Sequence, residues 1–149
     1  MEKDPRDEAL KLKNQLCFPL YAAARKITGS YAPFLKPLGL TYTQYLVMMV
    51  LWEEQQVMVG DLGRKLFLDT GTLTPLLKKM EEHGLITRRR CPEDERCVQI
   101  SLTEDGQKLK EKARDIPQQV GSCVKLDPEE AMQLYRTLYK ILGTNCGEM

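Results

Sequence analysis

The spacing of apolar residues changes once along the chain, at Gly84, and this change limits the folds that the chain can adopt. Before Gly84, apolar residues recur at helical spacing in two short segments, and Asp69 stands where it can cap the second one. After it, two stretches read as strands joined by the polar turn CPEDER, namely Leu85–Arg90 and Cys97–Leu102. Two short helices followed directly by a hairpin, here called the wing, predict a winged helix-turn-helix over Val59–Leu102.

Helical patterns precede this region. Apolar residues recur with helical spacing over Arg6–Ser30, and a proline inside that run, Pro19, predicts a kink or a local opening beside Cys17. Thr41 and Gln44 have the spacing of a capping box, and the segment that follows them is nearly all apolar. A buried helix is therefore expected before the helix-turn-helix.

Two further helices are expected after the wing. Thr103 caps a long helix that runs to about Cys123, and Asp127 begins another that ends near Gly143. The chain contains no repeats and no Gly/Ser linker, so its 149 residues are expected to form one domain. The predicted fold class is mainly α, with a small β component.

Composition sets the broad class of the protein but not its function. A hydrophobic content of 42% with 29% charged residues is typical of globular proteins. No apolar run is long enough for a membrane span, and Met1–Lys13 lacks the apolar core of a secretory signal, so we expect a cytoplasmic protein without a membrane partner. The five cysteines are odd in number and irregularly spaced, which indicates free thiols. The net charge is only +1, so nucleic-acid binding depends on where the charges lie.

The second short helix has a polar face that suits DNA. This face carries Thr70, Thr72, Thr74, Lys78 and Lys79. Hydroxyls near a helix N-terminus suit base edges or phosphate oxygens, and lysines suit the DNA backbone. On the wing, Arg88 and Arg90 are placed for phosphates, and Asp94 is expected to pair with Arg96 and orient its guanidinium for the minor groove. An ordinary solvated face is the alternative interpretation of these side chains.

Several motifs resemble those of MarR-type regulators. They are Leu68–Lys79, Gly84-Leu85-Ile86, Asp94-Glu95-Arg96 and Ser101-Leu102-Thr103. The similarity extends from about Leu16 to Leu142. It implies a homodimeric repressor of transcription that binds a pseudo-palindromic operator in double-stranded DNA. It also implies that the terminal segments, about residues 1–40 and 103–149, form an intertwined dimerisation domain. The DNA-binding lobe then comprises about residues 59–102.

A narrower similarity concerns the trigger for release from DNA. The runs QLCFPLY (residues 15–21) and LTYTQY (residues 40–45) resemble the thiol-based branch of this family, which includes organic-hydroperoxide repressors. In that branch a cysteine of the first helix is oxidised and is hydrogen-bonded by tyrosines, which implies these roles for Cys17, Tyr31 and Tyr42. The resemblance also implies that oxidised Cys17 condenses with Cys123 of the other subunit or with a small external thiol.

Alternatives to this trigger stay open at the level of sequence. A small aromatic ligand between the dimerisation and DNA-binding regions would be lined by Tyr21, Tyr31, Tyr42 and Trp52. Cys17 on an apolar helical face also fits an inert buried residue. A thiol peroxidase would need a base or cation near Cys17, and none is evident, so no enzymatic activity is expected. Cys91 and Cys97 flank the wing turn and suit a disulfide or a share in a zinc site, but they lack metal-knuckle spacing, so no metal or cofactor is expected.

Overall fold

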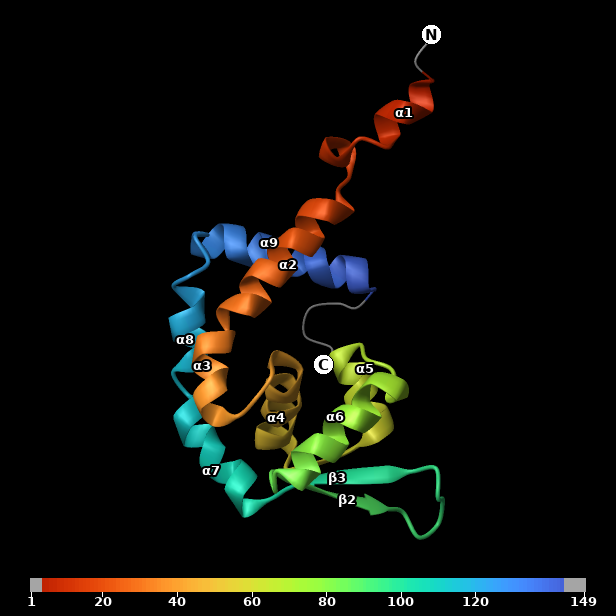
Figure 1. The fold of residues 1–149 in the computed structure, drawn as a ribbon, viewed down its shortest axis with the longest axis vertical. Coiled ribbons are helices and arrows are strands. Elements are labelled where there is room, and N and C mark those ends of the chain that lie inside the picture. Colours follow the sequence, from red (N-terminus) through yellow and green to blue (C-terminus); the bar gives the residue numbers. More distant parts are fainter. Residues whose placement is uncertain (1–3, 144–149) are drawn as a thin grey trace.

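The computed structural model describes residues 4–143, and Figure 1 shows how their elements are arranged. The elements are α1 (Pro5–Ala9), η1 (Leu12–Asn14), α2 (Cys17–Ser30), α3 (Ala32–Leu35), η2 (Lys36–Leu38), α4 (Tyr42–Glu54), β1 (Gln56–Met58), α5 (Val59–Leu66), α6 (Thr70–Glu82), β2 (Ile86–Arg90), β3 (Val98–Leu102), α7 (Glu104–Ala113), α8 (Ile116–Gly121) and α9 (Pro128–Leu142). This order confirms the predicted fold class, a mainly helical chain that contains a winged helix-turn-helix.

Helix α4 is the centre of the hydrophobic core. Its predicted capping box is present: Thr41 Oγ1 accepts from the Gln44 amide at 3.3 Å, and Gln44 Oε1 accepts from the Thr41 amide at 3.0 Å. Val47, Met48 and Leu51 are fully buried. Helices α5, α6 and α7 and strand β3 all contact α4, so it connects the helix-turn-helix to the rest of the subunit.

The sheet confirms the predicted hairpin and adds one strand to it. Strands β2 and β3 pair antiparallel, with Arg88 opposite Ile100, and the sheet order is β1-β3-β2. Strand β1 was not predicted, because three residues are too few to show an alternating pattern. Ile86 and Ile100 are fully buried and fix the base of the wing. The other end of the hairpin extends away from the helices (Figure 1).

The N-terminal helical run is interrupted beside Cys17, as predicted. The interruption is an opening rather than a kink, because α1 ends at Ala9 and α2 begins only at Cys17. Pro19 lies in the first turn of α2. Backbone amides in a first turn have no acceptor within the helix, so a proline there removes no hydrogen bond. Pro19 is therefore compatible with a regular helix start.

The predicted long helix from Thr103 to about Cys123 is also wrong. Thr103 does cap α7, since its Oγ1 accepts from the Gly106 amide at 3.0 Å. The helix ends at Ala113, and α8 begins with Pro117 in its first turn. Pro117 has no N–H to donate to the Ala113 carbonyl four residues earlier, and its ring crowds that carbonyl, which explains why the helix does not continue past Ala113. Helix α9 begins with the predicted capping box at Asp127.

Helices α2 and α9 bury none of their residues within the described chain. They instead expose large apolar side chains, and those exposed by 40% or more are Phe18, Leu20, Tyr21, Met132, Leu134, Tyr135, Ile141 and Leu142. Figure 1 shows that α1 and the start of α2 extend away from the body of the molecule. Apolar surface of this extent is typical of a protein–protein interface. Over residues 4–143, no helix combines the length and hydrophobicity that crossing a membrane requires.

Candidate functional site

The helix-turn-helix gives α6 one buried face and one exposed face. Asp69 caps the helix as predicted. Its Oδ1 accepts a hydrogen bond from the Thr72 amide at 2.7 Å, and this bond, with a second from the Thr72 hydroxyl, lowers the pKa of the Asp69 carboxyl. Leu73 and Leu77 are buried on the inner face, and α6 contacts α4, α5 and β2. This packing leaves the opposite face open to a partner.

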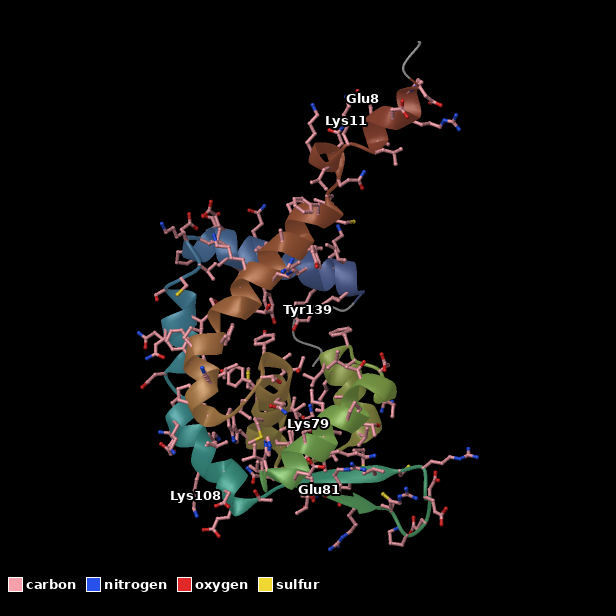
Figure 2. All side chains as sticks on the ribbon, in the orientation of Figure 1. Glu8, Lys11, Lys79, Glu81, Lys108 and Tyr139 are labelled. Carbon is pink, nitrogen blue, oxygen red and sulfur yellow. The ribbon has the colours of Figure 1, made fainter. Side chains whose placement is uncertain are left out.

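The exposed face of α6 carries the predicted polar residues, but two of its three hydroxyls are engaged within the helix. Thr72 Oγ1 donates to Asp69 Oδ2 at 3.1 Å, and Thr74 Oγ1 donates to the Thr70 carbonyl at 2.8 Å. Phosphate oxygens accept hydrogen bonds but do not donate them, so these two hydroxyls are less suited to phosphate than the sequence indicated. Lys78 and Lys79 are exposed on the same helix, and Figure 2 labels Lys79.

A side chain that the sequence did not single out joins α6 to the wing. Glu81 Oε2 accepts a hydrogen bond from the Arg88 amide at 2.7 Å. Strand β2 is an edge strand, and the Glu81 carboxylate satisfies one amide that has no strand partner. Glu81 therefore holds the strand that carries the predicted phosphate ligands Arg88 and Arg90 in a fixed relation to α6 (Figure 2). No local pattern marks this contact, because its two residues belong to different elements.

The wing tip is organised by Asp94, though not in the way predicted. The predicted Asp94–Arg96 side-chain pair is wrong: within residues 4–143, no ion pair joins the two side chains. Asp94 Oδ1 instead accepts from the Arg96 backbone amide at 2.9 Å, and the Asp94 carbonyl accepts from the Cys97 amide at 3.0 Å. Asp94 thus shapes the turn, and the Arg96 side chain is exposed at the tip.

Cys17 lies in the first turn of α2, and its side chain is a free, exposed thiol. Its neighbours Leu16 and Phe18 are 79% and 45% exposed. An inert cysteine buried inside the subunit is therefore ruled out. The thiol lies instead on the apolar surface of the N-terminal arm.

Tyr31 and Tyr42, the predicted hydrogen-bond partners of Cys17, contact each other at the opposite end of α2 from that cysteine. Their ring centroids are 4.8 Å apart, and Tyr45 joins them at 5.7 Å from Tyr31. Burial, followed by the proximity of Tyr31, raises the pKa of both Tyr42 and Tyr45. The 14 residues of α2 rise about 21 Å, so neither Tyr31 nor its neighbours in this cluster reach Cys17 of the same subunit. The sequence indicates Tyr45 only as a core residue.

The remaining cysteines occupy separate places. Cys123 follows α8 and is an exposed free thiol, with its Sγ donating to the Gln119 carbonyl at 3.6 Å. Cys91 and Cys97 are partly exposed free thiols on the wing. Within the described chain, no group of three or more metal-ligating side chains comes together. Cys146 lies outside the described residues.

A cavity of about 650 Å³ lies between α9 and the α4–α5 pair. Tyr42, Tyr135, Tyr139 and Lys65 are among its lining residues, and Figure 2 labels Tyr139. Trp52, predicted as a lining residue of a ligand site, belongs instead to the core, where its Nε1 donates to the Gly106 carbonyl at 3.0 Å. The predicted lining residue Tyr21 is 59% exposed on α2, with the Arg25 guanidinium over its ring.

Similar proteins agree with this arrangement. A family profile described as transcriptional regulator SarA/Rot matches residues 30–113. The organic hydroperoxide resistance transcriptional regulator of Bacillus subtilis is 53% identical over 135 residues, which cover 91% of this chain and 92% of that protein. The regulator SarZ of Staphylococcus haemolyticus is 41% identical over 134 residues, covering 90% of this chain and 91% of SarZ.

Solved structures of AbfR from Staphylococcus epidermidis share the fold at 35–37% sequence identity. The reduced protein bound to DNA and the overoxidized protein bound to DNA each give a TM-score of 0.76 and cover 93% of this chain. The matched region covers 97% of the overoxidized AbfR chain and 96% of the reduced AbfR chain. The similarity therefore spans both the winged lobe and the flanking helices.

Proposed function

Because the chain belongs to the SarA/Rot family of MarR-type winged-helix transcriptional regulators, we propose that it is a homodimeric repressor that leaves DNA when organic hydroperoxides oxidise Cys17. The observation that carries this proposal is the exposed thiol of Cys17 on an apolar arm, far from the tyrosines of its own subunit. We place the protein in the cytoplasm, where thiols are kept reduced between oxidation events.

The apolar surfaces of α2 and α9 suit a two-fold dimer. Residues of about 1–40 and 103–149 then serve as the dimerisation domain, and residues 59–102 serve as the DNA-binding lobe. Antiparallel arms related by a two-fold axis bring the C-terminal end of one α2 toward the N-terminal end of the other. Tyr31 and Tyr42 of one subunit then face Cys17 of its partner, which one subunit alone does not permit.

Each subunit presents α6 to the major groove and the wing to the backbone and minor groove. Thr70, Lys78 and Lys79 contact the DNA from α6, while Thr72 and Thr74 offer acceptors. Arg88 and Arg90 contact phosphates, and Arg96, held by the turn that Asp94 forms, reaches the minor groove. Two such lobes require a pseudo-palindromic operator whose half-sites are about one helical turn apart.

The chemistry of release proceeds in two steps. The Cys17 thiolate attacks a peroxide oxygen, which yields a sulfenic acid and an alcohol. The sulfenic acid then condenses with a second thiol to form a disulfide and water. Cys123 of the other subunit is the proposed second thiol. Where Cys123 is absent, a small external thiol takes its place. Phenolic donors from Tyr31 and Tyr42 stabilise the thiolate that the first step requires.

A gel-shift assay on the protein's own promoter region, with and without cumene hydroperoxide, tests this proposal. We expect wild type to release the DNA and Cys17→Ser to remain bound. The matched variant Cys123→Ser shows whether the second thiol is internal, because an intersubunit disulfide then no longer forms. If mass spectrometry shows that Cys17 of the wild-type protein is oxidised and the protein still binds DNA, the mechanism is refuted.

The cavity between α9 and α4–α5 supports a second candidate trigger, a small aromatic acid. Its tyrosines offer ring contacts, and Lys65 offers a positive charge for a carboxylate. Lys65 is already paired with Glu54 at 2.7 Å, which leaves less of its charge for a ligand. We therefore favour oxidation of Cys17 over ligand binding as the trigger for release from DNA. Release of Cys17→Ser from DNA by an aromatic acid such as salicylate would reverse that preference.

A further inference from the structure

We propose that Cys91 and Cys97 form a second redox site, a cross-strand dithiol at the neck of the wing that low-molecular-weight disulfides oxidise to a disulfide. This site responds to the thiol–disulfide balance rather than to hydroperoxides. It lies in the DNA-binding lobe, remote in sequence from the Cys17 arm, and its closure alters the wing tip.

The register of the hairpin places the two cysteines opposite each other. Arg90 pairs with Val98 at the end of the β2–β3 ladder, and the next hydrogen bond joins the Cys91 amide to the Cys97 carbonyl at 2.9 Å. Opposed residues in a hydrogen-bonded antiparallel pair have Cα atoms about 5.5 Å apart. Disulfides span Cα separations of about 4.4–6.8 Å, so this spacing suits the bond. Opposed Cβ atoms are about 4.5–5.5 Å apart and a disulfide needs about 3.5–4.5 Å, so closure requires a local movement of the hairpin end of up to about 1 Å.

Both thiols are also on the accessible face of the hairpin. Residues two apart in a strand share a face, so Cys91 and Cys97 lie on the side of Arg89 and Gln99, opposite the buried Ile100. Each is a free, partly exposed thiol. A small disulfide therefore reaches them without opening the core.

The turn between them holds the pair in place. Pro92 restricts Cys91 to extended conformations. At the other end, the Asp94 carbonyl accepts from the Cys97 amide at 3.0 Å, and Asp94 Oδ2 accepts from the Cys97 thiol at 3.6 Å. The two sulfurs are thus attached to a backbone that is ordered before oxidation, which lowers the entropic cost of joining them.

The electrostatics of the turn set the order of events. The negative charge of Asp94 raises the pKa of the Cys97 thiol, with burial and the hydrogen bond acting in the same direction. Because the thiolate is the nucleophile, Cys91 attacks the external disulfide first and expels one thiolate. Cys97 then loses its proton to solvent and attacks Cys91 Sγ, which expels the second thiolate. The two wing thiols are oxidised, and the external disulfide is reduced to two thiols.

Formation of this bond removes one of the contacts that shape the wing tip. The Cys97 sulfur turns from Asp94 toward Cys91, so Asp94 Oδ2 loses its donor. Asp94 also positions the Arg96 backbone, and Arg96 is the residue proposed to reach the minor groove. We therefore expect the oxidised wing to bind DNA more weakly.

Tryptic mapping of the full-length wild-type protein tests the bond. Cleavage after Arg90 and Arg96 separates the cysteines into the peptides CPEDER and CVQISLTEDGQK. After incubation with oxidised glutathione we expect these two peptides as one cross-linked species, which dithiothreitol separates. Glutathione attached to either cysteine at the end of the reaction, without the cross-link, would overturn the proposal.

The regulatory consequence is tested in a variant that keeps only the wing thiols, Cys17→Ser/Cys123→Ser/Cys146→Ser. Its affinity for promoter DNA should fall at least about fivefold on oxidation, the lower end of the effect of one lost arginine contact. The matched control adds Cys97→Ser and should form only a mixed disulfide with glutathione. Unchanged affinity of the cross-linked protein refutes the regulatory role. Since the variant lacks Cys17, this result is independent of hydroperoxide sensing, whereas failure to bind DNA when reduced counts against the proposed function instead.

Discussion

Substitution of Gly106 by alanine should destabilise the subunit, although alanine is the better helix former. Gly106 lies in the first turn of α7, where a Cβ atom would meet the Leu85 carbonyl oxygen at 2.3 Å and Leu102 Cδ1 at 2.7 Å. The leucine side chain can move, but the Leu85 carbonyl is backbone and already accepts from the Thr103 amide at 3.2 Å. The Gly106 carbonyl itself accepts from Trp52 Nε1. Helix α7 therefore cannot move away without loss of hydrogen bonds.

The expected magnitude follows from three contributions. Overpacking typically costs about 1–3 kcal/mol, and the clash with backbone puts Gly106→Ala near the upper end. Strain on the hydrogen bonds of Leu85 and Trp52 adds about 1 kcal/mol, the worth of one such bond. The higher helix propensity of alanine offsets up to about 1 kcal/mol of this loss of stability. The free energy of unfolding should thus fall by roughly 2–3 kcal/mol, a drop of about 4–12 °C in melting temperature for a chain of this size.

Urea denaturation followed by far-ultraviolet circular dichroism measures this change, at equal protein concentrations because dimer stability depends on concentration. Gly121→Ala is the matched control, since it also lies in a helix and a Cβ atom added there would meet nothing within 4 Å. The control should be as stable as wild type or slightly more so. If Gly106→Ala matched its control, the close approach of α7 to the base of the wing would be refuted.

Three further outcomes are expected. Arg96→Ala should weaken DNA binding by about 1–3 kcal/mol in a fluorescence-anisotropy titration, whereas Arg114→Ala, a surface change at the far end of α7, should not. Asp69→Ala should lower thermal stability at neutral pH. Because the folded pKa of Asp69 lies below its usual 3.8, the carboxylate stabilises the fold above about pH 4, and that stability is lost as the pH falls through the folded pKa; Asp69→Asn should keep the cap without this pH dependence. Tyr42→Phe should slow oxidation of Cys17 by cumene hydroperoxide in stopped-flow measurements, and an unchanged rate would exclude Tyr42 as a phenolic donor to the thiol.

The sequence predicted those features whose cause is local. Asp69 caps α6, Thr41 and Gln44 form a capping box, and alternation marks β2 and β3, because each signal involves residues within a few positions of one another. The break between α7 and α8 was missed, and the opening before α2 was attributed to Pro19, because the sequence does not distinguish a proline in the first turn of a helix from one in its interior. Only the observed start of α2 at Cys17 distinguishes these cases.

The features that escaped prediction are contacts between elements. Glu81 and Arg88 meet because α6 packs beside β2, and Tyr45 joins Tyr31 because α3 turns the chain back onto α4. The prediction of an Asp94–Arg96 side-chain pair at the wing tip failed for a different reason. A carboxylate two residues before an arginine has both a side-chain and a backbone donor within reach, and sequence does not choose between them. The backbone amide is the donor in the structure.

Location in the fold determines what each proposed thiol site can do to DNA binding. In the proposed dimer, Cys17 lies on the arm that carries the interface, so its oxidation should change the distance between the two recognition helices and act on both half-sites at once. The wing pair lies inside a single DNA-binding lobe and acts on each half-site separately. Oxidation of Cys17 should therefore release a full operator but leave the weak binding of an isolated half-site nearly unchanged. Oxidation of the wing should weaken both, and titration of the two DNA lengths after each treatment separates these modes.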